Sequence, residues 1–152
     1  MNRAASSKLL YHNSADVKAW LGNQLGLTFV EPCYAIGVIN HKGLLTAAAV
    51  YTCYEERNVE LSVAGRIGRH AAVDIFYYAF NRLGCRRISA TVHEKKQDVI
   101  RQAIGMGWKI EGRKREYYGE GEDAIILGML RSECRVLQRG DERGIAKRHQ
   151  VA

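Results

Sequence analysis

Two parts of the sequence carry groups that could do chemistry: a carboxylate at Glu60, and a basic, glycine-containing segment shortly after it, Arg66-Ile67-Gly68-Arg69-His70-Ala71. The segment precedes a stretch with helical spacing. A helix N-terminus offers unpaired N–H donors and partial positive charge to an anion. Glycine permits close approach of the backbone, and arginine adds positive charge. Taken alone, the segment is equally typical of a solvated basic turn.

A proton transfer near neutral pH would need an ionisable side chain held in place. Glu60 alternates with the apolar Val59 and Leu61, so it lies on the opposite face of its predicted strand. His93 ends the next predicted strand, and the pair Tyr117–Tyr118 ends a later one. Each also has an ordinary structural interpretation: an exposed carboxylate, a surface histidine, and tyrosines that pack or line a rim.

The spacing of cysteine and histidine argues against a metal or redox site. The four cysteines form no C-x-x-C pair, and the histidines are scattered. In a cytoplasmic protein such cysteines are free thiols, mostly buried. The sequence therefore predicts no set of metal ligands. The residues concerned are Cys33, Cys53, Cys85 and Cys134, and His12, His41, His70, His93 and His149.

The composition is that of one globular domain of 152 residues. No apolar run approaches the ~18–20 residues of a spanning helix, and Met1–Lys8 lacks the apolar middle of a signal peptide. We therefore expect a cytoplasmic protein. The net charge of +7 favours an anionic partner, which could be nucleic acid, an acidic protein or a phosphorylated cofactor. Residues 138–152 are basic with little apolar content and are predicted to form a mobile tail after a domain over 1–137.

The elements that must position these side chains follow from the apolar spacing. A helix is predicted from residue 15 to Leu25, capped by Asn13 or Ser14 and ended by Gly26. Strands over 34–40 and 44–54 form a hairpin, and another strand covers 58–64. The second half alternates helices over 71–83 and 95–106 with strands over 86–93, 108–118 and 124–130.

The order of these elements predicts a fold class. A strand, a helix and a strand over 58–93 imply a parallel crossover, and such connections are right-handed. The class is therefore α+β, or mixed α/β, with a mostly antiparallel sheet and at least one parallel strand pair. On the helix over 95–106, the residues predicted to face inward are Val99, Ile100, Ala103 and Ile104.

Four passages carry a family resemblance: Val59–Gly65, Phe80–Ile88, Ile104–Arg113 and Gly128–Arg135. In this order and spacing they resemble the GCN5-related N-acetyltransferase (GNAT) superfamily. Within it, the chain looks closest to the ribosomal-protein N-terminal acetyltransferases and their phage and prophage relatives. The resemblance covers residues 15 to 137. It implies a central twisted, mostly antiparallel sheet flanked by helices, in which one parallel strand pair is splayed.

The resemblance implies acetyl-coenzyme A as the cosubstrate. In the family, backbone N–H groups of a loop before a helix wrap the pyrophosphate, and the pantetheine arm enters between the splayed strands. A backbone N–H at a bulge near Leu61–Val63 would then bind the acetyl carbonyl and stabilise the oxyanion. The family pattern has glycine where this chain has Arg69, whereas Ala71 fits it. The implied binding residues are Leu61, Ser62, Val63, Arg66, Ile67, Gly68, Arg69, His70, Ala71 and Lys96.

Acetyl transfer to an amine needs a base, because the ammonium form must lose a proton near neutral pH. The resemblance implies Glu60 as this base, with His93 in reserve. The sequence departs from the family at the acid, since Ala103 stands where many members have tyrosine. Tyr118 is a substitute acid. A thiol pKa of ~8.5 makes the thiolate a tolerable leaving group even without one.

Three functions are open from the sequence. The first is an acetyl-CoA-dependent N-acetyltransferase acting on a protein or peptide amine. The second is an inactive GNAT-fold effector that binds CoA or a host protein and works by occupancy; a phage-encoded member would do so in the host cytoplasm. The third is a nucleic-acid-binding module, suggested by charge but lacking a basic helix or an aromatic strand signature. Dimers are common among members of this family, so the resemblance also suggests a homodimer.

Overall fold

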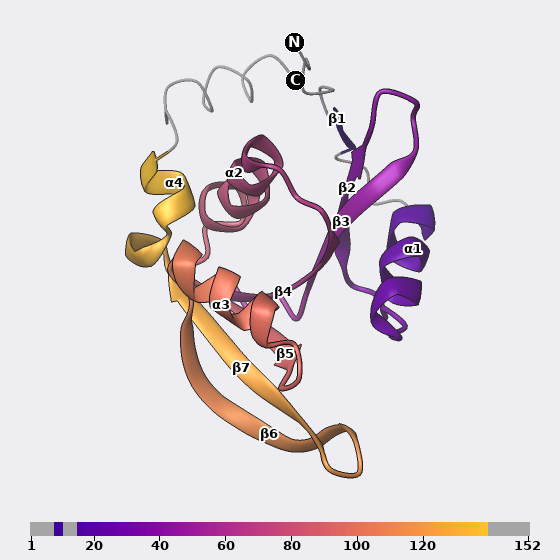
Figure 1. The fold of residues 1–152 in the computed structure, drawn as a ribbon. Helices are drawn as coiled ribbons and strands as arrows, with labels where there is room; N and C mark the ends of the chain where they lie inside the picture. Colours follow the sequence, from indigo (N-terminus) through magenta and orange to yellow (C-terminus); the bar gives the residue numbers. More distant parts are fainter. Residues whose placement is uncertain (1–7, 11–14, 140–152) are drawn as a thin grey trace.

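The computed structural model describes residues 8–10 and 15–139, which form one sheet with helices on both faces (Figure 1). The seven strands lie in the order β1-β2-β3-β4-β5-β7-β6. They are β1 (Lys8–Leu10), β2 (Tyr34–Ile39), β3 (Leu45–Thr52), β4 (Asn58–Gly65), β5 (Arg87–His93), β6 (Lys109–Gly119) and β7 (Glu122–Leu130). The helices are α1 (Ala15–Leu25), α2 (Arg69–Tyr77), continued by the π-helical turn η1 (Tyr78–Arg82), then α3 (Gln97–Met106), the 3-10 turn η2 (Arg131–Glu133) and α4 (Arg135–Arg139).

The sheet is antiparallel except at β4 and β5, which run parallel. This confirms the predicted mixed α+β class and its strand–helix–strand crossover. The two parallel strands pair at three positions only, from Asn58 opposite Arg87 to Glu60 opposite Ser89. Beyond Glu60 they part, which confirms the splayed pair that the family resemblance implies.

The two faces of the sheet bury separate cores. Val59 and Leu61 of β4 pack with residues of α2, α3 and α4 in the larger core. Val17 and Leu21 of α1 pack on the opposite face against β2 and β3. Because side chains alternate along a strand, Glu60 lies on the face that α1 partly covers. Figure 1 shows α1 on one side of the sheet and α2 and α3 on the other.

Helix α3 buries fewer of its apolar residues than the sequence predicts. Of the four residues of α3 predicted to face inward, Ile100 and Ala103 are buried, whereas Val99 is 46% exposed and Ile104 is 44% exposed. The prediction for Val99 and Ile104 was wrong because the packed stripe of this helix is narrower than its apolar stripe. No helix in the described ranges is long and apolar enough to cross a membrane.

Some predictions lie at the margins of the described chain. The cap at Asn13 or Ser14 falls outside the described residues, as does most of the predicted tail, 140–152. Residues 138 and 139 belong to α4. The short strand β1 and the short helix α4 were not anticipated, since three and five residues carry too little periodicity to be recognised.

Gly65, the last residue of β4, lies where the neighbouring backbone leaves no room for a side chain. Its φ is +90°, and a Cβ there would overlap the carbonyl oxygen of Thr46 and lie 2.6 Å from Ala47 Cα. We expect Gly65→Ala to lower the free energy of unfolding by about 2–4 kcal/mol, from backbone strain plus overpacking. Urea denaturation of both proteins measures this difference.

Gly43→Ala is the matched control for this prediction. Gly43 has a φ of +77°, but nothing lies within 4 Å of the Cβ it would gain. The control variant should therefore lose only the strain contribution, about 1–2 kcal/mol. Equal losses in the two variants would contradict the close approach of β3 at Gly65.

Candidate functional site

The candidate site begins where β4 and β5 part. Glu60 is the last residue of β4 that pairs with β5, opposite Ser89, and it pairs with Thr52 on its other side. Its side chain is half-buried on the α1 face. Among the described residues, none donates a hydrogen bond or forms an ion pair with this carboxylate. Glu60 therefore has a defined position on the sheet, and its carboxylate oxygens accept no hydrogen bond from a described residue.

The predicted bulge near Leu61–Val63 is wrong. The β3–β4 ladder runs in one register from Thr52 opposite Glu60 to Ala47 opposite Gly65. A bulge would place two residues opposite one and interrupt that register. The same stretch nonetheless has unpaired donors for a different reason. Because β5 has diverged, alternate residues over 61–65 direct their N–H groups away from β3 into the opening.

The side chains over 61–63 border this opening unequally. Leu61 is buried in the larger core, Ser62 is half-buried on the α1 face, and Val63 is 38% exposed. What the three residues share at the opening is their backbone, which borders it, and not the placement of their side chains. Any contact that they make with an acyl carbonyl would therefore come from main-chain N–H groups, with side-chain identity mattering little.

The segment after β4 leads to an uncapped helix. Gly68 is the N-cap residue of α2, in an extended conformation, and no side chain caps the helix. A Cβ at Gly68 would meet nothing within 4 Å, so the space above the turn is open. Arg66, Arg69 and His70 are exposed around it. The first turn of α2 therefore presents free N–H donors and cationic side chains, the arrangement that binds phosphate.

Two of the residues predicted to line this turn point into the core instead of toward solvent. Ala71 is buried, and Ile67 packs partly into the core. They anchor the turn through apolar contacts. Lys96 lies elsewhere, exposed at the N-cap of α3 after the end of β5. The structure therefore groups the residues of 66–70 around one turn and leaves Lys96 on a second one.

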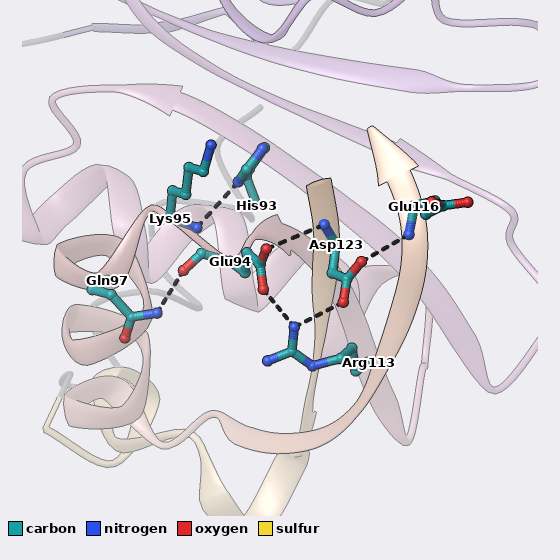
Figure 2. Close-up of polar contacts among 7 residues, drawn as sticks. All are labelled: His93, Glu94, Lys95, Gln97, Arg113, Glu116 and Asp123. Atoms are coloured by element: carbon teal, nitrogen blue, oxygen red, sulfur yellow. Dashed lines mark hydrogen bonds and ion pairs between the residues drawn. The ribbon is translucent and has the colours of Figure 1, made fainter. Parts of the chain in front are cut away.

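The turn that carries Lys96 is tied to the β6–β7 hairpin. Figure 2 shows Arg113 between the carboxylates of Glu94 and Asp123, which it contacts at the same guanidinium nitrogen. Asp123 also accepts the backbone N–H of Glu116 at 2.9 Å. These two contacts, the N–H first and the guanidinium second, lower the pKa of Asp123. The pairing therefore persists at neutral pH and holds the start of α3 against the hairpin.

His93 and Tyr118, the two reserve catalytic candidates, lie together at the end of β5. Their rings stack with centroids 4.8 Å apart and an interplanar angle of 20°. His93 Nδ1 accepts the backbone N–H of Lys95 at 3.1 Å, which leaves the proton on Nε2, 3.6 Å from Glu122 Oε1. The nitrogen that could accept a proton in this tautomer already accepts the Lys95 N–H, whereas no described residue donates a hydrogen bond to the Glu60 carboxylate.

The Tyr118 hydroxyl reaches back along β5 toward the splay. It donates to the carbonyl oxygen of Thr91 at 3.4 Å. Thr91 follows Ser89, the partner of Glu60, by two residues, roughly 7 Å along a strand. Burial and the nearby Tyr117 raise the pKa of Tyr118, so its hydroxyl stays protonated at neutral pH. Because Tyr118 stacks on His93, whose side chain shares a face of β5 with Ser89, Glu60 and Tyr118 lie on the same face of the sheet.

Sequence reasoning missed a second polar group on this face, formed by Asn58, Arg87, Ser89 and Glu111. One signal was available. Arg87 and Ser89 alternate with the apolar Ile88 and Ala90, which predicts a polar face on β5. That they meet Asn58 and Glu111 could not be read from spacing, because those residues lie on other strands.

Comparisons with known proteins identify the fold. No family model matches the chain, and no curated protein matches it. Mutant forms of the spermidine/spermine N-acetyltransferase SpeG from Vibrio cholerae share the structure with a TM-score of 0.70 and 14% identity, over 90% of this chain and 100% of that chain. An acetyltransferase of the GNAT family from Streptococcus pneumoniae gives 0.64 and 14%, over 82% and 99%. The chain therefore has the GNAT fold.

Proposed function

We propose that this chain is an N-acetyltransferase that transfers the acetyl group of acetyl-CoA to an amine. The observation that carries the proposal is the parting of β4 and β5 directly after Glu60. Along one strand and the turn that follows it lie a carboxylate, unpaired N–H groups and an open helix N-terminus. These are a base, an oxyanion donor and a phosphate site in the order that a thioester substrate would need.

The residues present suit acetyl-CoA as the cosubstrate. The open space at Gly68 and the uncapped start of α2 would receive the pyrophosphate, with Arg66 and Arg69 supplying charge. The gap between β4 and β5 would receive the pantetheine arm. Lys96, on the neighbouring turn, is a further cation for the coenzyme's phosphates.

The reaction is a direct attack on the thioester. Glu60 takes a proton from the acceptor ammonium, and the free amine forms a C–N bond with the acetyl carbon. N–H groups of 61–65 stabilise the oxyanion that develops on the carbonyl oxygen. The C–S bond then breaks, the thiolate of CoA leaves, and the second proton of the attacking nitrogen passes through solvent to this thiolate, which gives the neutral amide and the free thiol. Because a thiolate is a weaker base than tyrosinate, Tyr118 assists chiefly by donating a hydrogen bond to the sulfur, for which its hydroxyl would turn away from the Thr91 carbonyl oxygen.

The acceptor that we propose is a protein or peptide amine, in keeping with the family branch that the sequence resembles. The likeness to a spermidine/spermine acetyltransferase raises a polyamine as the competing acceptor. The two are separated by a thiol-release assay with a panel of α-amino peptides, lysine peptides and spermidine. Preference for spermidine over every peptide would overturn the choice of a peptide amine.

Calorimetric titration with acetyl-CoA, with CoA and ATP as comparators, tests the proposal as a whole. We expect stoichiometric binding of acetyl-CoA and CoA, and much weaker binding of ATP, which lacks the pantetheine arm. Absence of acetyl-CoA binding at millimolar concentration would overturn the proposal. Binding without turnover on any amine would favour the effector hypothesis instead.

Tyr118→Phe should lower kcat by about 10-fold while the dissociation constant of acetyl-CoA stays unchanged, as for loss of one transition-state hydrogen bond. Since the pKa of Tyr118 is raised, its hydroxyl keeps its proton to a higher pH than a free tyrosine. The loss should therefore be the same throughout pH 7 to 9. Tyr117→Phe, which changes an exposed neighbour, is the control. An unchanged kcat in Tyr118→Phe would remove this residue from the mechanism.

A further inference from the structure

Four polar side chains form a cluster on the α1 face beside Glu60, at the paired end of β4 and β5. Arg87 is its centre: Nε donates to Asn58 Oδ1 at 3.2 Å, and Nη2 donates to Ser89 Oγ at 3.3 Å and to Glu111 Oε2 at 2.6 Å. Ser89 Oγ in turn donates to Asn58 Oδ1 at 2.7 Å. We call these residues the Arg87 cluster. It joins β4, β5 and β6 through side chains.

The cluster occupies the positions at which β4 and β5 pair. Asn58 stands opposite Arg87, and Glu60 stands opposite Ser89. The strands share only three paired positions before they part, so the side-chain contacts reinforce a short ladder. The last of these positions belongs to Glu60. Whatever holds this ladder closed therefore also holds the candidate base in place.

Gly128 explains how the Arg87–Glu111 pair lies flat across β7. This strand runs between β5 and β6, and Gly128 is opposite Ser89 on one side and Lys109 on the other. A Cβ at Gly128 would overlap the Glu111 carboxylate and stand 2.6 Å from Arg87 Nη2. A side chain at Gly128 would displace the ends of Arg87 and Glu111, so glycine leaves the room in which the ion pair lies.

Stability alone does not account for this cluster. The Arg87 and Glu111 side chains are 34% and 38% exposed, and partly exposed ion pairs contribute little to folding. The contacts instead hold the Arg87 guanidinium in one orientation, in which it donates to three acceptors. Its charge also compensates Glu111, which would otherwise add a second carboxylate to the face that carries Glu60. The residues flanking Glu60 on β3 and β5, Thr52 and Ser89, carry no charge.

We propose that Arg87 is a positioning residue for Glu60. Its hydrogen bonds to Asn58 and Ser89 span the paired positions of β4 and β5 up to the one that holds Glu60, and it places a positive charge on the same face. The inference rests on the proposed function, because it takes Glu60 as the base of the transfer. Arg87 acts through Asn58, Ser89 and Glu111 and touches no reacting atom.

Two substitutions test the proposal, one that removes a positive charge from the cluster and one that removes a negative charge. Arg87→Met leaves Glu111 uncompensated, which disfavours a second ionised carboxylate nearby, so the acid limb of the kcat–pH profile should move to higher pH. Glu111→Gln removes the carboxylate that pairs with Arg87 and leaves the guanidinium near Glu133, which is itself paired with Lys109. The face therefore gains one positive charge, so the same limb should move to lower pH. We also expect kcat at its optimum to fall by about 10-fold in Arg87→Met, the cost of a small misplacement of the base. Acetyl-CoA affinity should change less than twofold, because the turn at 66–70 lies at the other end of β4.

Arg87→Lys separates position from charge. Lysine keeps the positive charge but cannot donate as a planar fork. This variant should lose rate while the acid limb stays where it is in the wild type. Loss of kcat with no movement of the limb in either Arg87→Met or Glu111→Gln would reduce the cluster to a structural role and overturn the proposal.

The remaining outcomes are also decisive. If Arg87→Met fails to fold, judged by circular dichroism, Glu111→Gln decides alone, because it preserves shape: no shift to lower pH overturns the proposal. Glu60→Gln distinguishes the two levels of inference. If it is as active as the wild type, the base assignment fails and this inference with it. If it is inactive while both cluster variants match the wild type, only the present inference fails.

Discussion

Glu60→Gln should lower kcat for amine acetylation by about 10²- to 10⁴-fold, the contribution typical of a positioned general base. Glutamine keeps the size of the side chain and its place opposite Ser89, but it cannot accept a proton near neutral pH. The dissociation constant of acetyl-CoA should not change, since the turn at 66–70, where we propose that the phosphates bind, lies beyond the other end of β4 from this carboxylate. Thiol release at saturating acceptor, together with calorimetry, measures both quantities.

The pH dependence of this defect makes the test sharper. An acceptor amine that has already lost its proton needs no base, so the loss should shrink as pH approaches the amine pKa, ~7.7–8.0 for an α-amine and ~10.4 for lysine. Glu56→Gln is the matched control, since Glu56 is an exposed carboxylate in the turn before β4. Activity of Glu60→Gln within about threefold of the control at pH 7 is too high for removal of a general base and would exclude that role.

Arg69→Ala and Arg66→Ala should each raise the dissociation constant of acetyl-CoA by about 10- to 100-fold, the effect of removing one charge-assisted hydrogen bond to phosphate. Both arginines are exposed beside the uncapped N-terminus of α2. At saturating acetyl-CoA, kcat should be restored, because both side chains follow the end of β4, away from Glu60 near its start. Titration of each variant at low and high salt measures the change, which should shrink as salt screens the phosphates.

The control for these variants must remove one positive charge elsewhere. Arg101→Ala does so on α3, where the side chain is 73% exposed and its one ion pair within the described ranges is with Asp98 of the same helix. We expect its affinity for acetyl-CoA to stay within twofold of the wild type. A similar loss in Arg101→Ala and Arg69→Ala would indicate a general effect of net charge. Unchanged affinity in Arg69→Ala would mean that the turn does not bind phosphate.

Local features of the structure followed closely from the sequence. The α1 helix ends at Leu25 as predicted, followed by Gly26 with a φ of +68°. The strand that carries Glu60 and the helix after the basic turn were located to within two residues at their starts. These predictions succeed because apolar periodicity and glycine punctuation act between residues a few positions apart. The class of fold follows from the order of such elements.

The errors lie where packing decides. A bulge in β4 was expected near Leu61–Val63, but an unbroken ladder with β3 excludes it. Val99 and Ile104 were expected to be buried, but the surface that α3 meets is too narrow to cover them. In both cases the residue types permit either arrangement, and the neighbouring element selects one.

The sequence by itself determined the elements, the mixed fold class, the place of Glu60 on a strand and the basic turn that starts α2. Only the tertiary structure decided that β7 lies between β5 and β6, that β4 and β5 part at Glu60, and that Arg87 meets Glu111 over Gly128. The physical reason is range. Periodicity reflects forces along one element, whereas strand order, register and the Arg87 cluster depend on contacts between residues far apart in the chain, such as Arg87 with Glu111, 24 positions away.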